Sequence, residues 1–97
     1  MLAIQRKYCL SNRPNLHVQF EVNPIGKLEV EIIELHQHHS TDFEDLSFRS
    51  QGNVIEVCGR EKHVPWRCNL AVSDALELSS LVEEANEEYE VLMRDLM

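Results

Sequence analysis

The stretch LHVQFEVNPIGKLEVEI, residues 16–32, decides the fold class of this chain. Apolar and polar residues alternate strictly through residues 16–22, and they alternate again through residues 28–32. A period of two is typical of a strand with one buried face. Between the two runs, Pro24 presets one turn dihedral and Gly26 supplies a positive one. The stretch therefore predicts an antiparallel β-hairpin whose apolar face lies in the core.

Weaker strand signals follow this hairpin. Residues 46–50 and 54–58 predict a second hairpin around a turn at 51–53, because the later run is rich in β-branched side chains. Residues 67–72 predict a short edge strand. The alternation slips by one at Ile32-Ile33, which either a bulge or the end of the strand would explain.

Other segments carry no clear strand pattern. The polar segment 36–45 is predicted to be a loop, and residues 59–67 are predicted to be irregular because Pro65 bars a central strand there. Residues 1–10 fit either a strand or a short helix, and the sequence leaves both open.

The last quarter of the chain predicts one long amphipathic helix from Ser73 to Met97. Neither Gly nor Pro interrupts it, and Ser73 or Asp74 can cap its start, with Asp74 and Glu77 at capping-box spacing. Its apolar residues recur at alternating intervals of three and four, which places them on one face: Ala75, Leu78, Val82, Ala85, Tyr89, Leu92 and Leu96.

The hairpins and the helix each have one apolar face, which neither can bury alone. We therefore expect an α+β fold: a small antiparallel β-sheet of four strands or so, built from hairpins and packed by one long C-terminal amphipathic helix. The length of 97 residues predicts a single α+β domain over residues 1–97.

The composition narrows the function classes. A formal net charge of −8 argues against binding nucleic acid directly through its phosphates, and against docking on an anionic membrane. The three cysteines, Cys9, Cys58 and Cys68, do not form a disulfide framework. Neither a signal peptide nor a membrane-spanning stretch is present, so we expect a soluble cytoplasmic protein.

The negative charge is concentrated on the predicted helix. From Ser73 onward the chain has eight carboxylates and one base, Arg94, so this segment carries −7 of the total charge of −8. Such a face can bind a basic protein, for instance as an inhibitor or antidote-like factor that imitates the phosphates of a nucleic acid. The candidate contacts are Glu83, Glu84, Glu87, Glu88 and Asp95. The alternative interpretation is an ordinary solvated helix exterior.

Trp66 is the remaining candidate for a partner contact. It follows Pro65 in a segment that also carries Arg60, Lys62 and Arg67, and Trp and Arg are enriched in interface hot spots. The alternative is that the large indole closes one end of the core.

Two other hypotheses stay open. Imidazoles and thiols at His36, His38, His39, His63, Cys58 and Cys68 suggest a transition-metal module, although their spacing matches no zinc motif. The apolar stripe of the helix also has heptad spacing, which suggests a structural oligomer subunit and leaves monomer and homodimer open. The chain lacks a nucleophile elbow and a glycine-rich phosphate loop, so we expect neither enzymatic activity nor a cofactor.

Overall fold

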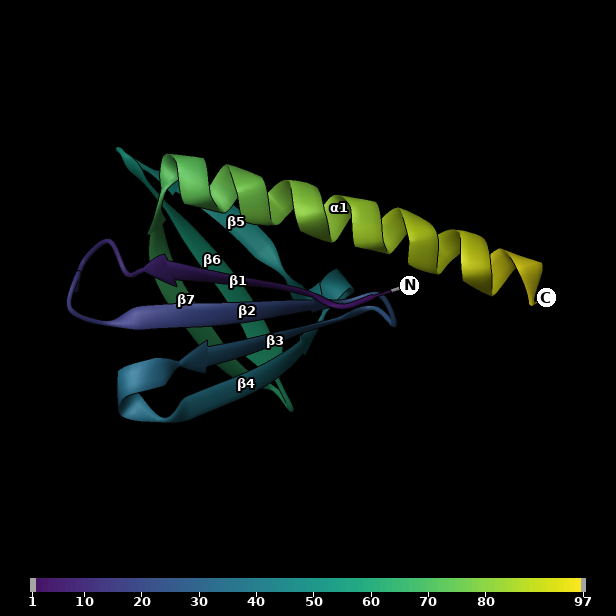
Figure 1. Ribbon diagram of the computed structural model, residues 1–97, viewed down its shortest axis with the longest axis horizontal. Coiled ribbons are helices and arrows are strands. Elements are labelled where there is room, and N and C mark those ends of the chain that lie inside the picture. The colour runs from purple at the N-terminus through teal and green to yellow at the C-terminus, as the bar shows by residue number, and fades with distance from the viewer. Residues whose placement is uncertain (1, 97) are drawn as a thin grey trace.

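The computed structural model describes residues 2–96 and confirms the α+β fold class. Within that part of the chain it has seven strands, two single-turn 3-10 helices and one long helix (Figure 1). The elements are β1 (Ile4–Cys9), β2 (His17–Asn23), β3 (Lys27–Ile32), η1 (Ile33–Leu35), β4 (Gln37–Asp42), η2 (Phe43–Asp45), β5 (Ser47–Gln51), β6 (Val54–Glu61), β7 (Val64–Ala71) and α1 (Val72–Asp95).

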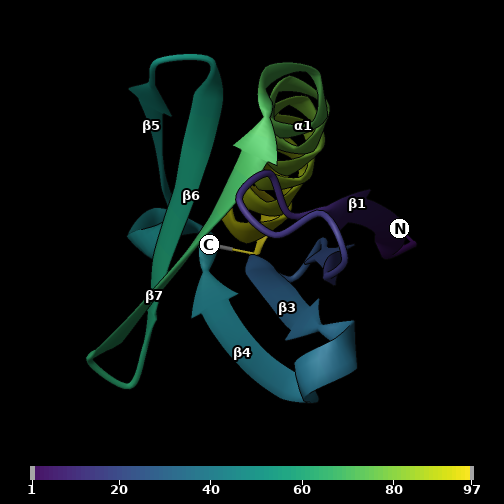
Figure 2. The same cartoon turned by 90° about the vertical axis from the view of Figure 1, so that its left-hand side faces the viewer.

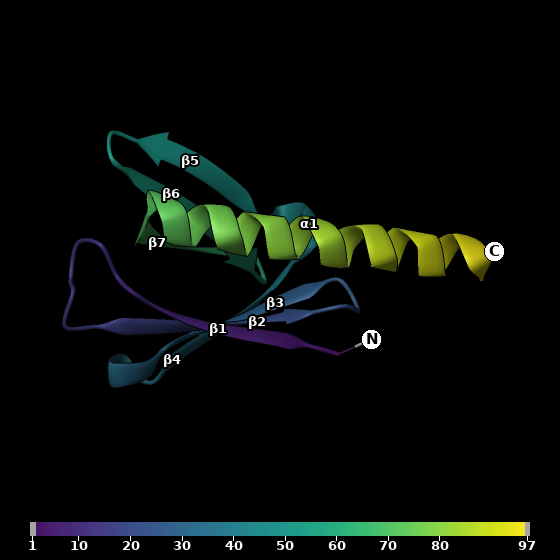
Figure 3. The ribbon, with the colours of Figure 1, turned by 45° about the horizontal axis from the view of Figure 1, so that its top comes forward.

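The strands form two antiparallel sheets rather than the one sheet that the sequence predicted. The first has the order β1-β2-β3-β4 and the second the order β5-β6-β7. Figure 3 shows α1 running between the two sheets, and the helix contacts β1 and β2 of one and β6 and β7 of the other. Figure 2 looks along the helix and shows β7 directly beside its first turns.

The hairpin at residues 16–32 is confirmed as β2 and β3. Phe20 pairs with Val30 and Val22 pairs with Leu28, and all four side chains are buried. Gly26 closes the turn with a φ of 96°, a backbone conformation that side-chain-bearing residues rarely adopt. The slip in alternation after residue 32 is the end of the strand, because the chain enters η1 there.

The predicted loop at 36–45 is wrong, since most of it forms β4. This strand lies at the edge of its sheet, and only Thr41 among its residues is buried. An edge strand with an almost fully polar sequence lacks the apolar alternation from which strands are recognised. The segment 1–10, for which strand and helix were open, contributes β1 at the other edge.

The predicted irregular segment at 59–67 is also wrong. Here β6 continues to Glu61 and β7 begins at Val64, joined by a two-residue turn. Both turn residues, Lys62 and His63, have positive φ angles of 50° and 70°, a conformation that hairpin turns usually assign to Asn or Gly. Pro65 is tolerated because β7 is an edge strand.

The helix begins at Val72, one residue before the predicted start. Ala71 occupies the cap position and makes no side-chain cap hydrogen bond, so the predicted capping by Ser73 or Asp74 is wrong. Asp74 lies inside the first turn, where its charge still complements the positive end of the helix dipole. The predicted last helical residue, Met97, lies outside the described residues.

A buried polar contact joins the two sheets. The indole Nε1 of Trp66 in β7 donates to the hydroxyl of Thr41 in β4 at 2.6 Å, and that hydroxyl donates to the carbonyl of Arg60 in β6 at 3.0 Å. Gly59 makes room for the indole, because a Cβ there would lie 2.5 Å from the ring. The apolar cluster around this contact includes residues of both sheets and of α1.

Candidate functional site

The structure places the predicted acidic residues on the outer surface of α1. Their side chains are exposed, and among residues 2–96 none of them forms an ion pair: Glu83, Glu84, Glu87, Glu88 and Asp95. The helix carboxylate that does have a basic partner is Glu77, which forms an ion pair with Arg6 at 3.5 Å and accepts a hydrogen bond from the hydroxyl of Tyr8 at 2.6 Å. The acidic face is therefore not neutralised by the rest of the described chain.

The spacing of these carboxylates makes them repel one another. Glu84 and Glu88 lie four residues apart on one side of the helix, and Glu83 and Glu87 repeat the arrangement on the adjacent side. Each pair of like charges at this spacing destabilises a helix by about 0.2–0.5 kcal/mol. We define the acidic face as the five candidate carboxylates named above.

The apolar stripe of α1 has two different environments. In the first half of the helix its residues are buried against the sheets: Ala75, Leu78, Val82 and Ala85. In the second half, Leu92 is 42 % exposed and Leu96 is 73 % exposed, and Met93 beside them is 42 % exposed. Figure 1 shows why, because the helix extends past the ends of the strands on the side of its C-terminus.

Tyr89 marks the boundary between these two halves. It is half-buried, and its ring packs on the β2–β3 turn so closely that a Cβ on Gly26 would lie 3.3 Å from it. The next residue of that turn towards the N-terminus, Ile25, is 61 % exposed. We call residues 89–96 the arm: it begins at Tyr89, which contacts the β2–β3 turn, and continues through the exposed apolar residues beyond it.

Trp66 is 8 % exposed and lies in the core, which agrees with the interpretation that its indole closes one end of the core rather than contacting a partner. One edge of the indole reaches a hollow of about 530 Å³ on the outer face of β5–β7, which Arg49, Arg60 and Arg67 also line. Glu56 shares this face, with Arg67 at 4.0 Å and the Cys58 thiol donating to it at 3.2 Å.

The histidines and cysteines do not converge. His38 lies 3.4 Å from Glu29, and His39 lies 3.6 Å from Glu61 while stacking on the indole of Trp66. Among residues 2–96 no group of three His, Cys, Asp or Glu side chains could hold a metal ion. The described residues thus offer the metal hypothesis no ligand set. Burial raises the pKa of Cys68 to about 12, which keeps that thiol protonated and unreactive.

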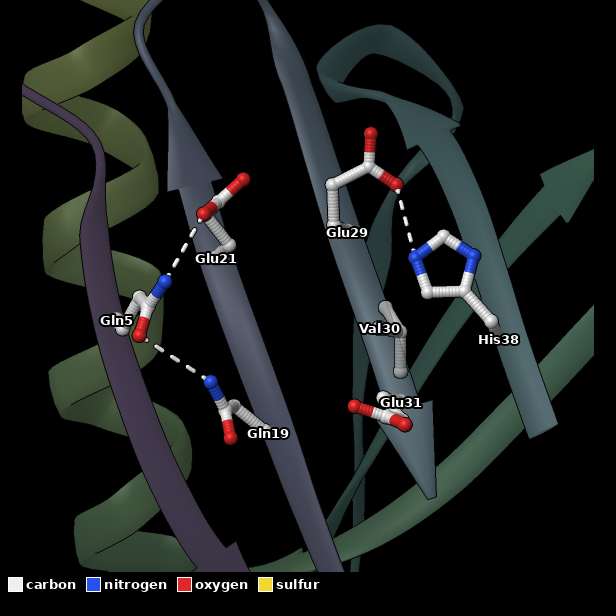
Figure 4. Close-up of a pocket in the computed structure, with 7 residues that line it drawn as sticks. All are labelled: Gln5, Gln19, Glu21, Glu29, Val30, Glu31 and His38. Carbon is white, nitrogen blue, oxygen red and sulfur yellow. Dashed lines mark hydrogen bonds and ion pairs between the residues drawn. The ribbon is translucent and has the colours of Figure 1, made fainter. Parts of the chain in front are cut away.

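A polar hollow on the open face of the four-stranded sheet was not predicted from the sequence. It has a volume of about 430 Å³ and is lined by Gln5, Gln19, Glu21, Glu29, Val30, Glu31 and His38 (Figure 4). Gln5 donates to Glu21 at 3.0 Å and accepts from Gln19 at 3.2 Å, so the amides and one carboxylate satisfy each other. The alternation had assigned Gln19, Glu21, Glu29 and Glu31 to the solvent side, but it could not show that a hollow forms there.

Comparisons with protein-family models, with curated proteins and with solved structures found no match. Within the described residues, no helix is both long enough and apolar enough to cross a membrane.

Proposed function

We propose that this protein acts without catalysis or a cofactor, by binding a larger protein that has a basic surface, as an inhibitor or antidote-like factor. The acidic face of α1 makes the contact. The observation that carries the proposal is that its five exposed carboxylates form no ion pair with any residue in the described range 2–96. Their charge is therefore available to a partner.

The spacing of the carboxylates supports recognition of an extended basic groove. Glu84, Glu88 and Asp95 follow one side of the helix at intervals of four and seven residues. At 1.5 Å per residue, this row is about 16 Å long. A nucleic-acid-binding protein presents Lys and Arg along a groove of such length, so the row can imitate part of a phosphate track.

The repulsion within the face is a second support. Interleaved Lys residues would stabilise the helix, whereas the two Glu pairs destabilise it. A sequence that keeps this arrangement gains a strong local field, which speeds encounter with an oppositely charged protein.

The test begins by isolating the protein gently from its source cells and identifying a co-purifying protein by native mass spectrometry. The association rate constant is then measured for the triple variant Glu84→Lys/Glu87→Lys/Glu88→Lys. We expect it to fall about tenfold or more, and we expect added salt to slow the unmodified protein in the same way.

The control variant changes the total charge equally but away from α1, at β2, β3 and η2: Glu21→Lys/Glu31→Lys/Asp45→Lys. It should retain most of the association rate. Equal rates for the two triple variants, a partner with an acidic surface, or a chain recovered alone would each contradict the proposal.

A further inference from the structure

The arm presents an apolar surface that the described chain does not cover. Leu92, Met93 and Leu96 are 42 to 73 % exposed, and they continue the same stripe that is buried further along the helix at Leu78 and Val82. Tyr89 packs on Gly26 of the β2–β3 turn, whereas Leu92, Met93 and Leu96 beyond it are exposed, so a helix that served only to close the core would not need them to be apolar. The stripe therefore exceeds what the fold uses.

The β2–β3 turn beside the arm also has an exposed apolar residue. Ile25, on the turn that Tyr89 contacts, is 61 % exposed and lines a hollow with Tyr89, and the charged residues Lys27, Asp42 and Glu44 line the same hollow. Leu92, Met93 and Leu96 lie together on one side of the helix, and grouped exposed apolar side chains mark an interaction site more often than single ones do. By contrast, Val91 is 45 % exposed but lies on the opposite, acidic side of the helix, where it stands alone.

The charges around the arm decide what can cover it. Glu88 and Asp95 flank the stripe on one side, and Glu90 and Arg94 flank it on the other. A second copy of this chain would bring three carboxylates and one base against the same set, so most of the charges that meet would repel one another. A segment with Lys and Arg beside its apolar residues would instead pair with them.

We infer that the arm is the docking site for a basic amphipathic helix of the partner, which lays its apolar residues along Leu92, Met93 and Leu96. This inference rests on the proposed function and adds the form of the partner's surface. The two kinds of contact then have different kinetic effects: the carboxylates set the association rate, and the apolar stripe sets the lifetime of the complex.

Three synthetic helical peptides test the inference, with fluorescence anisotropy as the readout. The first has Leu on one face and Lys on the others; the second replaces its Leu with Gln; the third replaces its Lys with Glu. We expect the Leu/Lys peptide to bind at least about tenfold more tightly than the Gln/Lys peptide, and the Leu/Glu peptide to bind most weakly.

Variants of the protein locate the binding surface. Leu92→Gln/Leu96→Gln should remove the preference for the Leu/Lys peptide by shortening the lifetime of the complex. Val91→Gln is the control, because it removes an apolar side chain about as exposed as Leu92 from the other side of the helix, and it should leave the preference unchanged.

The outcomes separate the two proposals. Equal binding of the Leu/Lys and Gln/Lys peptides would overturn the inference while leaving the charge-based function standing. If neither Lys-containing peptide binds at low salt, the charge argument fails as well. A concentration-dependent dimer in sedimentation that Leu92→Gln/Leu96→Gln abolishes would overturn the inference in favour of a second copy as the occupant.

Discussion

The two halves of α1 carry the same apolar spacing in different surroundings. In the first half, Leu78 is fully buried between the two sheets, whereas in the second half Leu92 is 42 % exposed on the arm. The sequence pattern identifies which side of a helix is apolar, but not what covers that side. Where the fold provides no cover, the same pattern becomes a candidate for binding.

Equal substitutions in the two halves should have very different effects on stability. Leu78→Ala leaves a cavity in the core and should lower the free energy of unfolding by about 2–5 kcal/mol. Leu92→Ala should change it by only about 0.5 kcal/mol, because the side chain has few neighbours to lose. Chemical denaturation of both variants measures the difference. Similar losses for the two would show that the arm packs on the body and is not available for docking.

The contact between the sheets should be the next most sensitive point in the body. Thr41→Val leaves the indole N–H of Trp66 without its acceptor and the carbonyl of Arg60 without its donor. Burying unsatisfied polar groups costs about 1–3 kcal/mol, which a denaturation midpoint will show. Thr41→Ser keeps the hydroxyl and should recover most of the loss; if it does not, the contribution of Thr41 is packing rather than hydrogen bonding.

One acid-sensitive contact belongs to the body and not to the arm. The pKa of Glu34 is lowered from 4.5 to about 2, first by the backbone N–H of His17, which donates to it at 2.7 Å, and then by the His17 side chain. A carboxylate whose pKa is lowered by folding stabilises the folded state when the pH is above the pKa that it has in the unfolded chain. This stabilisation is lost as the pH falls from about 4.5 towards 2.

The measurement for this contact is the urea midpoint as a function of pH. In Glu34→Gln the midpoint should fall less steeply below pH 4.5 than in the unmodified protein. Identical slopes for the unmodified protein and Glu34→Gln would contradict the assignment.

The smallest expected effect is a gain in stability rather than a loss. Glu84→Lys replaces a repulsive pair with an attractive one towards Glu88, and it should stabilise the protein by about 0.2–0.5 kcal/mol while slowing association with a basic partner. Thermal denaturation at low salt would detect the gain. A loss of stability would mean that Glu84 has a stabilising contact within the chain.

The parts of the fold that were predictable share a physical cause. The β2–β3 hairpin and α1 bury one face each, so their sequences carry the period of that face. β4 was missed because Thr41 is its only buried residue, so its sequence carries no apolar alternation. The β6–β7 turn was missed because Lys62 and His63 have positive φ angles, which these residue types rarely adopt. Whether the hairpins form one sheet or two depends on contacts distant in sequence, such as Trp66 with Thr41.

The candidate site divides in the same way. The acidic face was identified from residue spacing, because charge on a helix exterior needs no tertiary information. The arm could not be identified, since only the structure shows that the strands end before the helix does (Figure 1). Trp66 could be assigned to the core or to a surface from sequence alone, and its burial required both sheets to be in place.

The most direct test of the central claim is hydrogen–deuterium exchange of the protein, alone and bound to the basic protein that co-purifies with it. In the free protein, the amides of residues 89–96 should exchange faster than those of the first turns of α1. On binding, protection should increase across residues 83–96 and stay unchanged on the outer faces of both sheets. Protection confined to the sheets, with the helix unaffected, would contradict the account.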